Sequence, residues 1–233
     1  WSELPIGQNR PSGDIKLRLW DGNQWGSIMA ITDDADADMA PSVEFDSSGN
    51  LVIVYQRSIE NIPTMVEQLD TFANGLEIHY VVYDPVSQSV INSGQITSNS
   101  NNDFGPTIKT DNNNNLHVFW QRANGTHIFG DTINTVSLHT SSWDNNSQTW
   151  SNEETIADNL DYTLGWSAAS YSEDKMTVAL LVDTNDDFNS NSDRELFQIS
   201  KMDGVWENPV QITNNLINDD APLTAYNGMG EPV

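Results

Sequence analysis

The sequence predicts an all-β fold in which a four-stranded antiparallel unit is repeated along the chain. Turns anchored on aspartate recur 59 to 63 residues apart, and a fixed period of this kind is the signature of repeated units. A second position, nine residues after each Ile-Thr or Ile-Ala pair, holds proline in three copies and tryptophan in one. No window shows the sustained apolar period of a helix. The two sets are Asp21, Asp84, Asp144 and Asp203, and Pro41, Pro106, Trp166 and Pro222.

Aligned segments in the middle of the unit predict a β-hairpin. Ser42–Tyr55 and Thr107–Trp120 each contain two runs rich in β-branched and apolar residues, joined by a turn of Asp, Asn, Ser or Gly. Such turn residues between two apolar runs are typical of hairpins. The third copy, Ser167–Leu180, keeps this pattern with Glu173 and Asp174 at the turn.

Each unit therefore has four short strands, named A to D in chain order. Strand A is expected near 41–46, 106–111, 166–172 and 222–227. Strand B is expected near 51–57, 116–122 and 176–182. Strand C is expected near 15–20, 76–83, 134–143 and 194–202, and strand D near 27–31, 90–96, 151–156 and 208–212.

Units of this kind predict a β-propeller with about four four-stranded antiparallel blades in this chain, because radial packing leaves only short, protected strand edges. We expect a single propeller domain or propeller fragment over 1–233, with repeats near 15–75, 76–133, 134–193 and 194–233. The pattern stops at Val233, where a strand B should begin. We therefore expect a piece of a larger propeller, with ring closure by Trp1–Ile6 as the alternative.

A recurring pattern runs Ile-Thr, then Asp-x-x-Pro, then a short turn, then Gly/Asn-Leu-x-Val-x-Trp/Tyr, at Ile31–Tyr55 and Ile96–Trp120. It resembles the blade repeats of bacterial and archaeal surface propellers. Ser142–Trp150 is similar, in a degenerate form, to the Asp-box of sialidase-like propellers, but it is one residue longer and has Asn-Ser where that box has Gly. The resemblance implies a propeller fold. The box is a structural turn in that family, so the resemblance implies no catalysis.

The composition is strongly acidic, with 34 Asp and Glu against 9 Lys and Arg and a formal net charge of -25. Such a surface repels phosphate backbones and anionic lipid headgroups, so it disfavours nucleic acid as a partner. No apolar run is long enough for membrane insertion. The absence of cysteine excludes disulfides and thiolate chemistry. Together with the repeats, these features indicate an extracellular or cell-surface protein.

Three aspartates stand three residues before the strand A proline. If the A strands line a central channel, these carboxylates form a partial ring, and a cation such as Ca²⁺ would relieve their repulsion. The alternative is that each aspartate accepts hydrogen bonds from its own loop. The residues are Asp38, Asp103 and Asp219, with Thr163 in the third copy.

The segment 183–193 predicts a second Ca²⁺ site, because oxygen-bearing side chains occupy its alternate positions as they do in calcium loops. Phe188 stands where an EF-hand has glycine, and Arg194 stands where it has a bidentate Glu, so a solvated loop is the alternative. The predicted ligands are Asp183, Asn185, Asp187, Asn189 and Asp193.

Arg57 and Arg122 share one repeat position at the end of strand B, which suggests a structural role with neighbouring acids as partners. The third copy has Val182 there, so the sequence offers no arginine cluster shared by all copies. No serine nucleophile elbow, glycine-rich phosphate loop or histidine metal spacing occurs. We therefore assign no catalytic residue and favour a protein that is not an enzyme.

The sequence leaves two functions open. The first is a non-enzymatic binding or assembly module, stabilised by Ca²⁺, whose partner is an extracellular glycan, a protein, or other domains of a larger surface protein. The alternative is a carbohydrate-active propeller, a glycoside hydrolase or polysaccharide lyase, because the acids of such enzymes carry no local motif. That alternative predicts a pocket lined by aromatic residues, and its candidates are Trp166, Tyr162 and Phe104.

Overall fold

The computed structural model describes residues 1–3, 13–58, 75–124, 135–160, 162–185 and 193–233. Every regular element in these ranges is a β-strand. No helix able to cross a membrane occurs in them. The strands form four antiparallel sheets, which we call I to IV in chain order.

Sheets I and II come from the N-terminal part of the chain. Sheet I contains β1 (Ser2–Glu3), β2 (Asp14–Leu17) and β3 (Met29–Ala30). Sheet II contains β4 (Ala37–Phe45), β5 (Leu51–Ser58), β6 (Glu77–Asp84) and β7 (Ser89–Gln95), paired in this order.

Sheets III and IV repeat this order and add a short fifth strand. Sheet III contains β8 (Asn102–Thr110), β9 (Leu116–Ala123), β10 (Val136–Asp144), β11 (Thr149–Trp150) and β12 (Glu154–Leu160). Sheet IV contains β13 (Thr163–Ser172), β14 (Lys175–Asp183), β15 (Arg194–Met202), β16 (Val205–Trp206) and β17 (Val210–Gln211). In each of these two sheets the third strand pairs with both strands that follow it.

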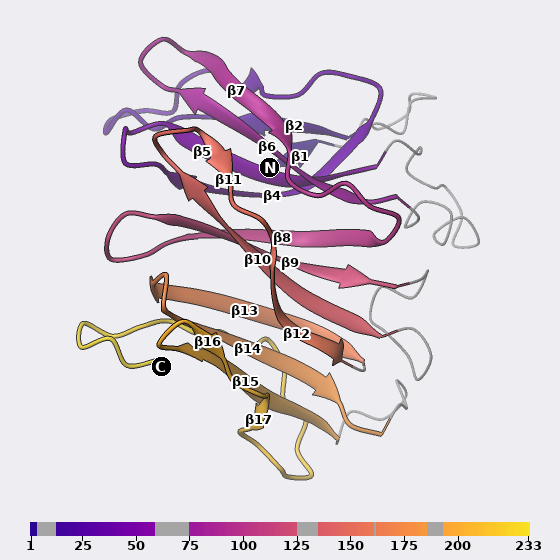
Figure 1. Cartoon of the computed structure of the whole chain (residues 1–233). Helices are drawn as coiled ribbons and strands as arrows, with labels where there is room; N and C mark the ends of the chain where they lie inside the picture. Colours follow the sequence, from indigo (N-terminus) through magenta and orange to yellow (C-terminus); the bar gives the residue numbers. More distant parts are fainter. Residues whose placement is uncertain (4–12, 59–74, 125–134, 161, 186–192) are drawn as a thin grey trace.

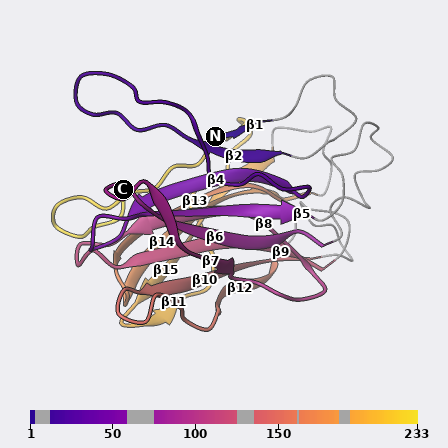
Figure 2. The same ribbon diagram turned by 90° about the horizontal axis from the view of Figure 1, so that it is seen from above.

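The sheets follow one another in chain order, with sheet I at one end of the row and sheet IV at the other (Figure 1). Strand β4 contacts β8, and β8 contacts β13, so the first strands of sheets II, III and IV are neighbours. Seen from above, these first strands lie on one side and the last strands on the opposite side (Figure 2). This arrangement confirms the predicted all-β fold of repeated four-stranded antiparallel sheets, and it is the packing of propeller blades.

The apolar core lies in three layers between consecutive sheets. In β5, Val52 and Val54 point into the cluster shared with sheet III, whereas Leu51, Ile53 and Tyr55 point into the cluster shared with sheet I. Successive side chains of a strand face opposite sides of the sheet, so a strand covered on both faces is apolar throughout. A third cluster joins sheets III and IV.

Aspartates at both kinds of turn hold the backbone, as expected for structural turn residues. In the hairpin between β4 and β5, Asp46 Oδ1 accepts the N–H groups of Ser48 and Asn50 at 2.9 and 2.8 Å. The hairpin between β8 and β9 repeats this arrangement around Asp111. Hydrogen bonds within the turns, chiefly from Gln24 N–H, the Ser87 hydroxyl and Asn146 N–H, lower the pKa values of three recurring aspartates. These are Asp21, Asp84 and Asp144.

Candidate functional site

The first aspartate of the predicted ring lies in an ion pair inside its own sheet. Asp38 in β4 is fully buried and faces Arg57 in β5. Its carboxylate accepts hydrogen bonds from Arg57 Nε and Nη2 at 2.6 and 2.8 Å. Arg57 also contacts Asp34 at 2.8 Å and Asp36 at 3.4 Å. The hydrogen bond with Asp38 raises the pKa of Arg57 despite partial burial, so the guanidinium balances the acids around it.

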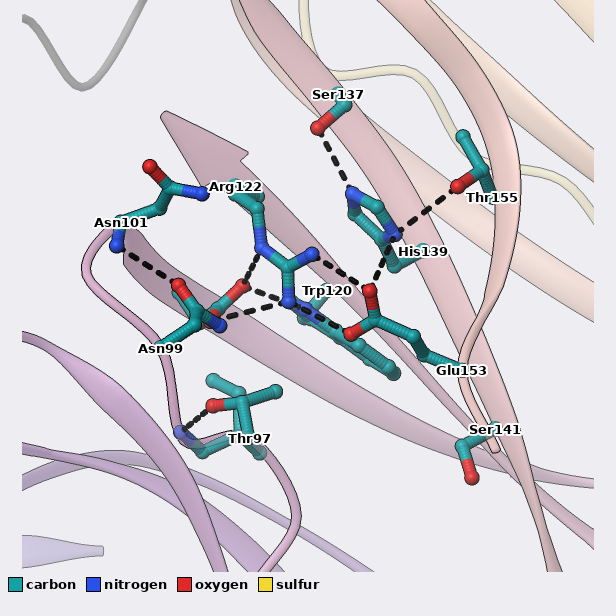
Figure 3. A network of polar contacts seen from close by, with 12 residues as sticks. Thr97, Asn99, Asn101, Trp120, Arg122, Ser137, His139, Ser141, Glu153 and Thr155 are labelled. Atoms are coloured by element: carbon teal, nitrogen blue, oxygen red, sulfur yellow. Dashed lines mark hydrogen bonds and ion pairs between the residues drawn. The ribbon is translucent and has the colours of Figure 1, made fainter. Parts of the chain in front are cut away.

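The second aspartate, Asp103, accepts hydrogen bonds in a larger network around Arg122, whose other members include Trp120 and Glu153 (Figure 3). Arg122 in β9 donates to Asp103 through Nε at 2.7 Å, and Trp120 Nε1 donates to the same carboxylate at 2.8 Å. Two further bonds of 2.7 Å join Arg122 to both oxygens of Glu153. Burial disfavours the charge of Arg122, but its bonds with Glu153 and Asp103 outweigh burial and raise its pKa. The bond with Arg122 also lowers the pKa of Glu153.

The connection from sheet II to sheet III is attached to this network. Asn99 donates to Asp103 Oδ2 at 2.7 Å through its side chain, and to Glu77 at 2.8 Å through its backbone. Thr97 donates to the other oxygen of Glu77. Burial raises the pKa of Glu77 even though both hydrogen bonds oppose the shift. The network therefore links the end of one sheet to the first two strands of the next.

Two histidines occupy one repeat position beside these arginines. His139 stacks on Trp120 with ring centroids 5.6 Å apart, and His79 stacks on Tyr55 at 5.9 Å. Burial, with a further contribution from the neighbouring arginine, lowers the pKa of each histidine to about 4. Both rings are consequently neutral at physiological pH and serve as packing groups.

The third predicted ring residue, Asp219, accepts a hydrogen bond of 2.5 Å from Thr213. Within the described ranges, no group of three or more histidine or acidic side chains could hold a metal ion. Asp38 and Asp103 have guanidinium partners instead. Calcium binding by the three aspartates stays a prediction.

The predicted calcium loop is described only at its two ends. Asp183 is buried at the end of β14, and the N–H of Asn185 lies 3.3 Å from its Oδ1. Asp193 directly precedes β15. Asp187 and Asn189 lie outside the described residues. The loop prediction is therefore still to be tested.

The junction of sheets III and IV lacks the charged residues that this pattern has between sheets II and III. Thr163 and Val182 are neighbours across β13 and β14, where the other two sheets have the Asp–Arg pair. Ser137 and Ala157 stand at the repeat positions of the Glu–Thr pair, and Trp166 stands at that of proline. At the junction of sheets III and IV, uncharged residues therefore stand at every one of these positions of the charged network.

A cavity of about 440 Å³ opens at this same junction, between β8 and β13. Two of the predicted ligand-binding residues, Phe104 and Trp166, line it, and Tyr162 is not among its lining residues. Trp166 also packs against the apolar cluster between sheets III and IV. No Asp or Glu lines the cavity. Its lining consists of Phe104, Gly105, Thr107, Lys109, Gln121, Leu164, Gly165, Trp166, Ser167, Ala168 and Leu223.

The corresponding place between sheets II and III is closed by two hydrogen bonds. The N–H of Ile108 in β8 donates to Ser42 Oγ in β4 at 3.1 Å. The N–H of Gly105 donates to Gln56 Oε1 at 2.8 Å. Gly105 has a φ of 63°, a left-handed conformation that glycine adopts without steric cost.

Neither bond has a counterpart between sheets III and IV in the described part of the chain. The equivalent pairs would be Thr107 with the N–H of Ala168, and Gln121 with the N–H of Gly165. Gly165 lacks the positive φ of Gly105. Gln121 is 4% exposed, and its Nε2 has no hydrogen-bond partner. Sequence analysis missed Gln121, although its repeat position, shared with Gln56, was a usable signal.

Comparisons with known proteins show similarity in fold alone. No family model and no curated protein matches the sequence. Among solved structures, the chain is similar to a Hadza microbial sialidase, with 11% identity and a TM-score of 0.58 over 86% of this chain and 41% of that one. It is also similar to a PL25 ulvan lyase, with 9% identity and a TM-score of 0.56 over 97% and 57% of the two chains.

An α-L-arabinanase from Penicillium chrysogenum, complexed with arabinobiose, gives 11% identity and a TM-score of 0.52 over 99% of this chain and 68% of that one. The chain spans 41% and 57% of the sialidase and lyase chains. Its architecture is therefore that of the β-propellers found in these carbohydrate-active proteins, and it matches part of their larger propeller chains.

Proposed function

We propose that this chain is part of a carbohydrate-active propeller and binds a glycan in the cavity between β8 and β13. The observation that carries the proposal is the cavity itself, which combines two aromatic side chains with a buried amide, a lysine and hydroxyl groups. Its volume of about 440 Å³ suits a ligand of one or a few sugar rings, since small-molecule sites span about 300–1,000 Å³.

The lining matches the two kinds of surface that a sugar ring presents. The C–H face of a pyranose is apolar and packs on an aromatic ring, here Trp166 or Phe104. Its hydroxyl groups need hydrogen-bond partners once they leave water, and Gln121 and Thr107 offer them. These lining residues would bind and orient a sugar. None of them carries a carboxyl group or an imidazole ring.

The fold comparisons support the carbohydrate-active hypothesis over a module that only assembles with other domains. Sialidase, ulvan lyase and arabinanase are each named for a carbohydrate substrate. Because folds host many functions, this support is an analogy. We propose an extracellular or cell-surface location, in keeping with the acidic composition.

Calorimetric titration of the chain with a panel of defined oligosaccharides, followed by Trp166→Ala, tests the proposal. Truncation of Trp166 should weaken binding of any oligosaccharide hit at least about tenfold, in the range of aromatic contacts at binding sites. Trp20→Ala is the control, since Trp20 is 52% exposed and lies in the turn between β2 and β3, away from the cavity lining. It should leave binding unchanged.

Two results would contradict the proposal. One is that no oligosaccharide of the panel binds the intact chain. The other is that Trp166→Ala keeps its circular dichroism spectrum and binds as tightly as the parent.

A further inference from the structure

We propose that Gln121 and Lys109 make the cavity selective for ligands that carry an anionic oxygen group, such as a carboxylate or a sulfate ester. This inference rests on the proposed function, because it names the class of ligand at the same site. It depends on three observations about the lining: a buried amide nitrogen without a hydrogen-bond partner, an ammonium group with no ion pair to a described residue, and the absence of lining acids.

Gln121 is the first observation. A buried amide nitrogen without an acceptor costs free energy, so such groups are rare in folded proteins and call for an explanation. Gln56, at the same repeat position, accepts the N–H of Gly105 from the next sheet at 2.8 Å. Gln121 has no such bond and lines the cavity instead. Its Nε2 is thus a donor without an acceptor, on a residue that lines the cavity.

Lys109 is the second observation. It lies two residues after Thr107 on β8, and side chains two apart on a strand share one face. Several other cations of the described chain form ion pairs: Arg57 and Arg122 bind acids, and Lys201 binds Glu154 at 2.7 Å. Lys109 forms no ion pair with any described residue and lines the cavity.

The composition of the lining is the third observation. The protein has 34 acidic residues, yet none of them lines this cavity. A ligand anion would therefore meet an ammonium group and an amide donor without a carboxylate beside it. Charge-assisted hydrogen bonds of this kind are stronger than neutral ones, so a neutral sugar would bind less tightly.

The selectivity is measured with three probes of matched length. They are tetragalacturonate, a sulfated galactotetraose and neutral galactotetraose, titrated calorimetrically into the intact chain at fixed ionic strength. We expect at least one anionic probe to bind about tenfold or more tightly than the neutral one. The two anionic probes distinguish carboxylate from sulfate as the preferred group.

Two variants assign the selectivity to the named residues. Gln121→Glu keeps the shape of the side chain but replaces the donor with a negative charge, and Lys109→Met removes the charge while keeping an apolar stem. Each should reduce binding of the anionic probe about tenfold, and binding of the neutral probe by a clearly smaller factor. Gln56→Glu is the matched control, because it keeps the oxygen that accepts the Gly105 N–H. It should not change binding of any probe.

The outcomes separate the two proposals. Equal binding of neutral and anionic probes, with no effect of Gln121→Glu or Lys109→Met, overturns the selectivity but leaves glycan binding in place. Binding of no probe and of no other oligosaccharide overturns both. Loss of anionic binding in Gln56→Glu as well as in Gln121→Glu would attribute the effect to general charge and overturn the assignment.

Discussion

At the scale of single residues, the two histidines stacked on aromatic rings set a limit on acid stability. His79 and His139 have pKa values of about 4 in the folded chain and about 6.5 when unfolded. A depressed folded pKa gives a contribution to stability that is fully present above pH 6.5. This contribution is lost as the pH falls from 6.5 toward 4, because the two histidines are then protonated in the unfolded chain but still neutral in the folded chain.

The variant His79→Phe tests this pH dependence. Phe197 occupies the same repeat position in sheet IV, so the fold accepts phenylalanine there. Between pH 7 and pH 4, we expect the free energy of unfolding to fall by about 1–2 kcal/mol less in the variant than in the parent. This value already allows for the partial exposure of the ring. Urea unfolding at both pH values measures it. Parallel losses in parent and variant would show that His79 is protonated in the folded chain.

Single residues also show how far the sequence could predict the site. The shared repeat position of Arg57 and Arg122 indicated a structural role, and the structure gives each a buried aspartate partner. Phe104 and Trp166 were predicted as ligand-binding and line one cavity. The repeat position shared with Gln56 could have singled out Gln121, but the loss of its inter-sheet hydrogen bond could not be predicted, because that bond depends on the backbone conformation of Gly165 in the facing strand.

At the scale of strands, sheets II and III hold β4–β5 and β8–β9 together with an Asp–Arg pair, whereas sheet IV uses Thr163 and Val182. Removing one partner of a buried ion pair leaves an uncompensated charge, which costs about 3–5 kcal/mol. Replacing both partners with a pair already accepted at that place costs less. The residues of sheet IV therefore indicate which pair of substitutions to use in a double-mutant cycle on the Asp–Arg pair of sheet III.

We expect Arg122→Val to destabilise the chain by about 3 kcal/mol or more, because Asp103 is fully buried and loses its counter-charge. The double variant Asp103→Thr with Arg122→Val should recover about 1–2 kcal/mol of that loss. Recovery is incomplete because Trp120 Nε1 loses its acceptor. Chemical denaturation of the two single variants and the double variant measures the coupling. Additive losses would mean that the pair is not coupled in solution.

Several strands were predicted closely, but the strand A expected over 222–227 does not form, because Tyr226 makes only an isolated bridge with Pro232 there. Residues 51–57 and 116–122 correspond to β5 and β9, and 194–202 to β15. Alignment of the repeats located these strands, since each copy supports the others. The third copy was the least regular in sequence, with Trp166 in place of proline, and the cavity lies beside that tryptophan. The cavity itself could not be predicted from the sequence. It lies where the two hydrogen bonds that join sheets II and III have no counterpart between sheets III and IV.

At the scale of the whole molecule, the net charge of -25 opposes folding through self-repulsion. Ion pairs engage Arg57, Arg122, Lys16 and Lys201 in the described ranges. With 9 Lys and Arg against 34 acids, most acids cannot have a cation of their own. Repulsion among exposed carboxylates acts over the Debye length, which falls from about 30 Å at 0.01 M salt to about 10 Å at 0.1 M. Screening therefore stabilises the folded chain.

Thermal unfolding in NaCl and CaCl₂ at equal ionic strength separates this screening from the predicted calcium binding. We expect the Tm to rise by several degrees between 0.01 M and 0.1 M NaCl, because the folded chain brings the carboxylates closer together than the unfolded chain does. If the loop 183–193 binds Ca²⁺, CaCl₂ will raise the Tm further at the same ionic strength, since a ligand that binds only the folded state stabilises it. Chelator should reverse only that second increase. Identical Tm values in the two salts would show that the acids act as a screened surface and that the calcium prediction is wrong.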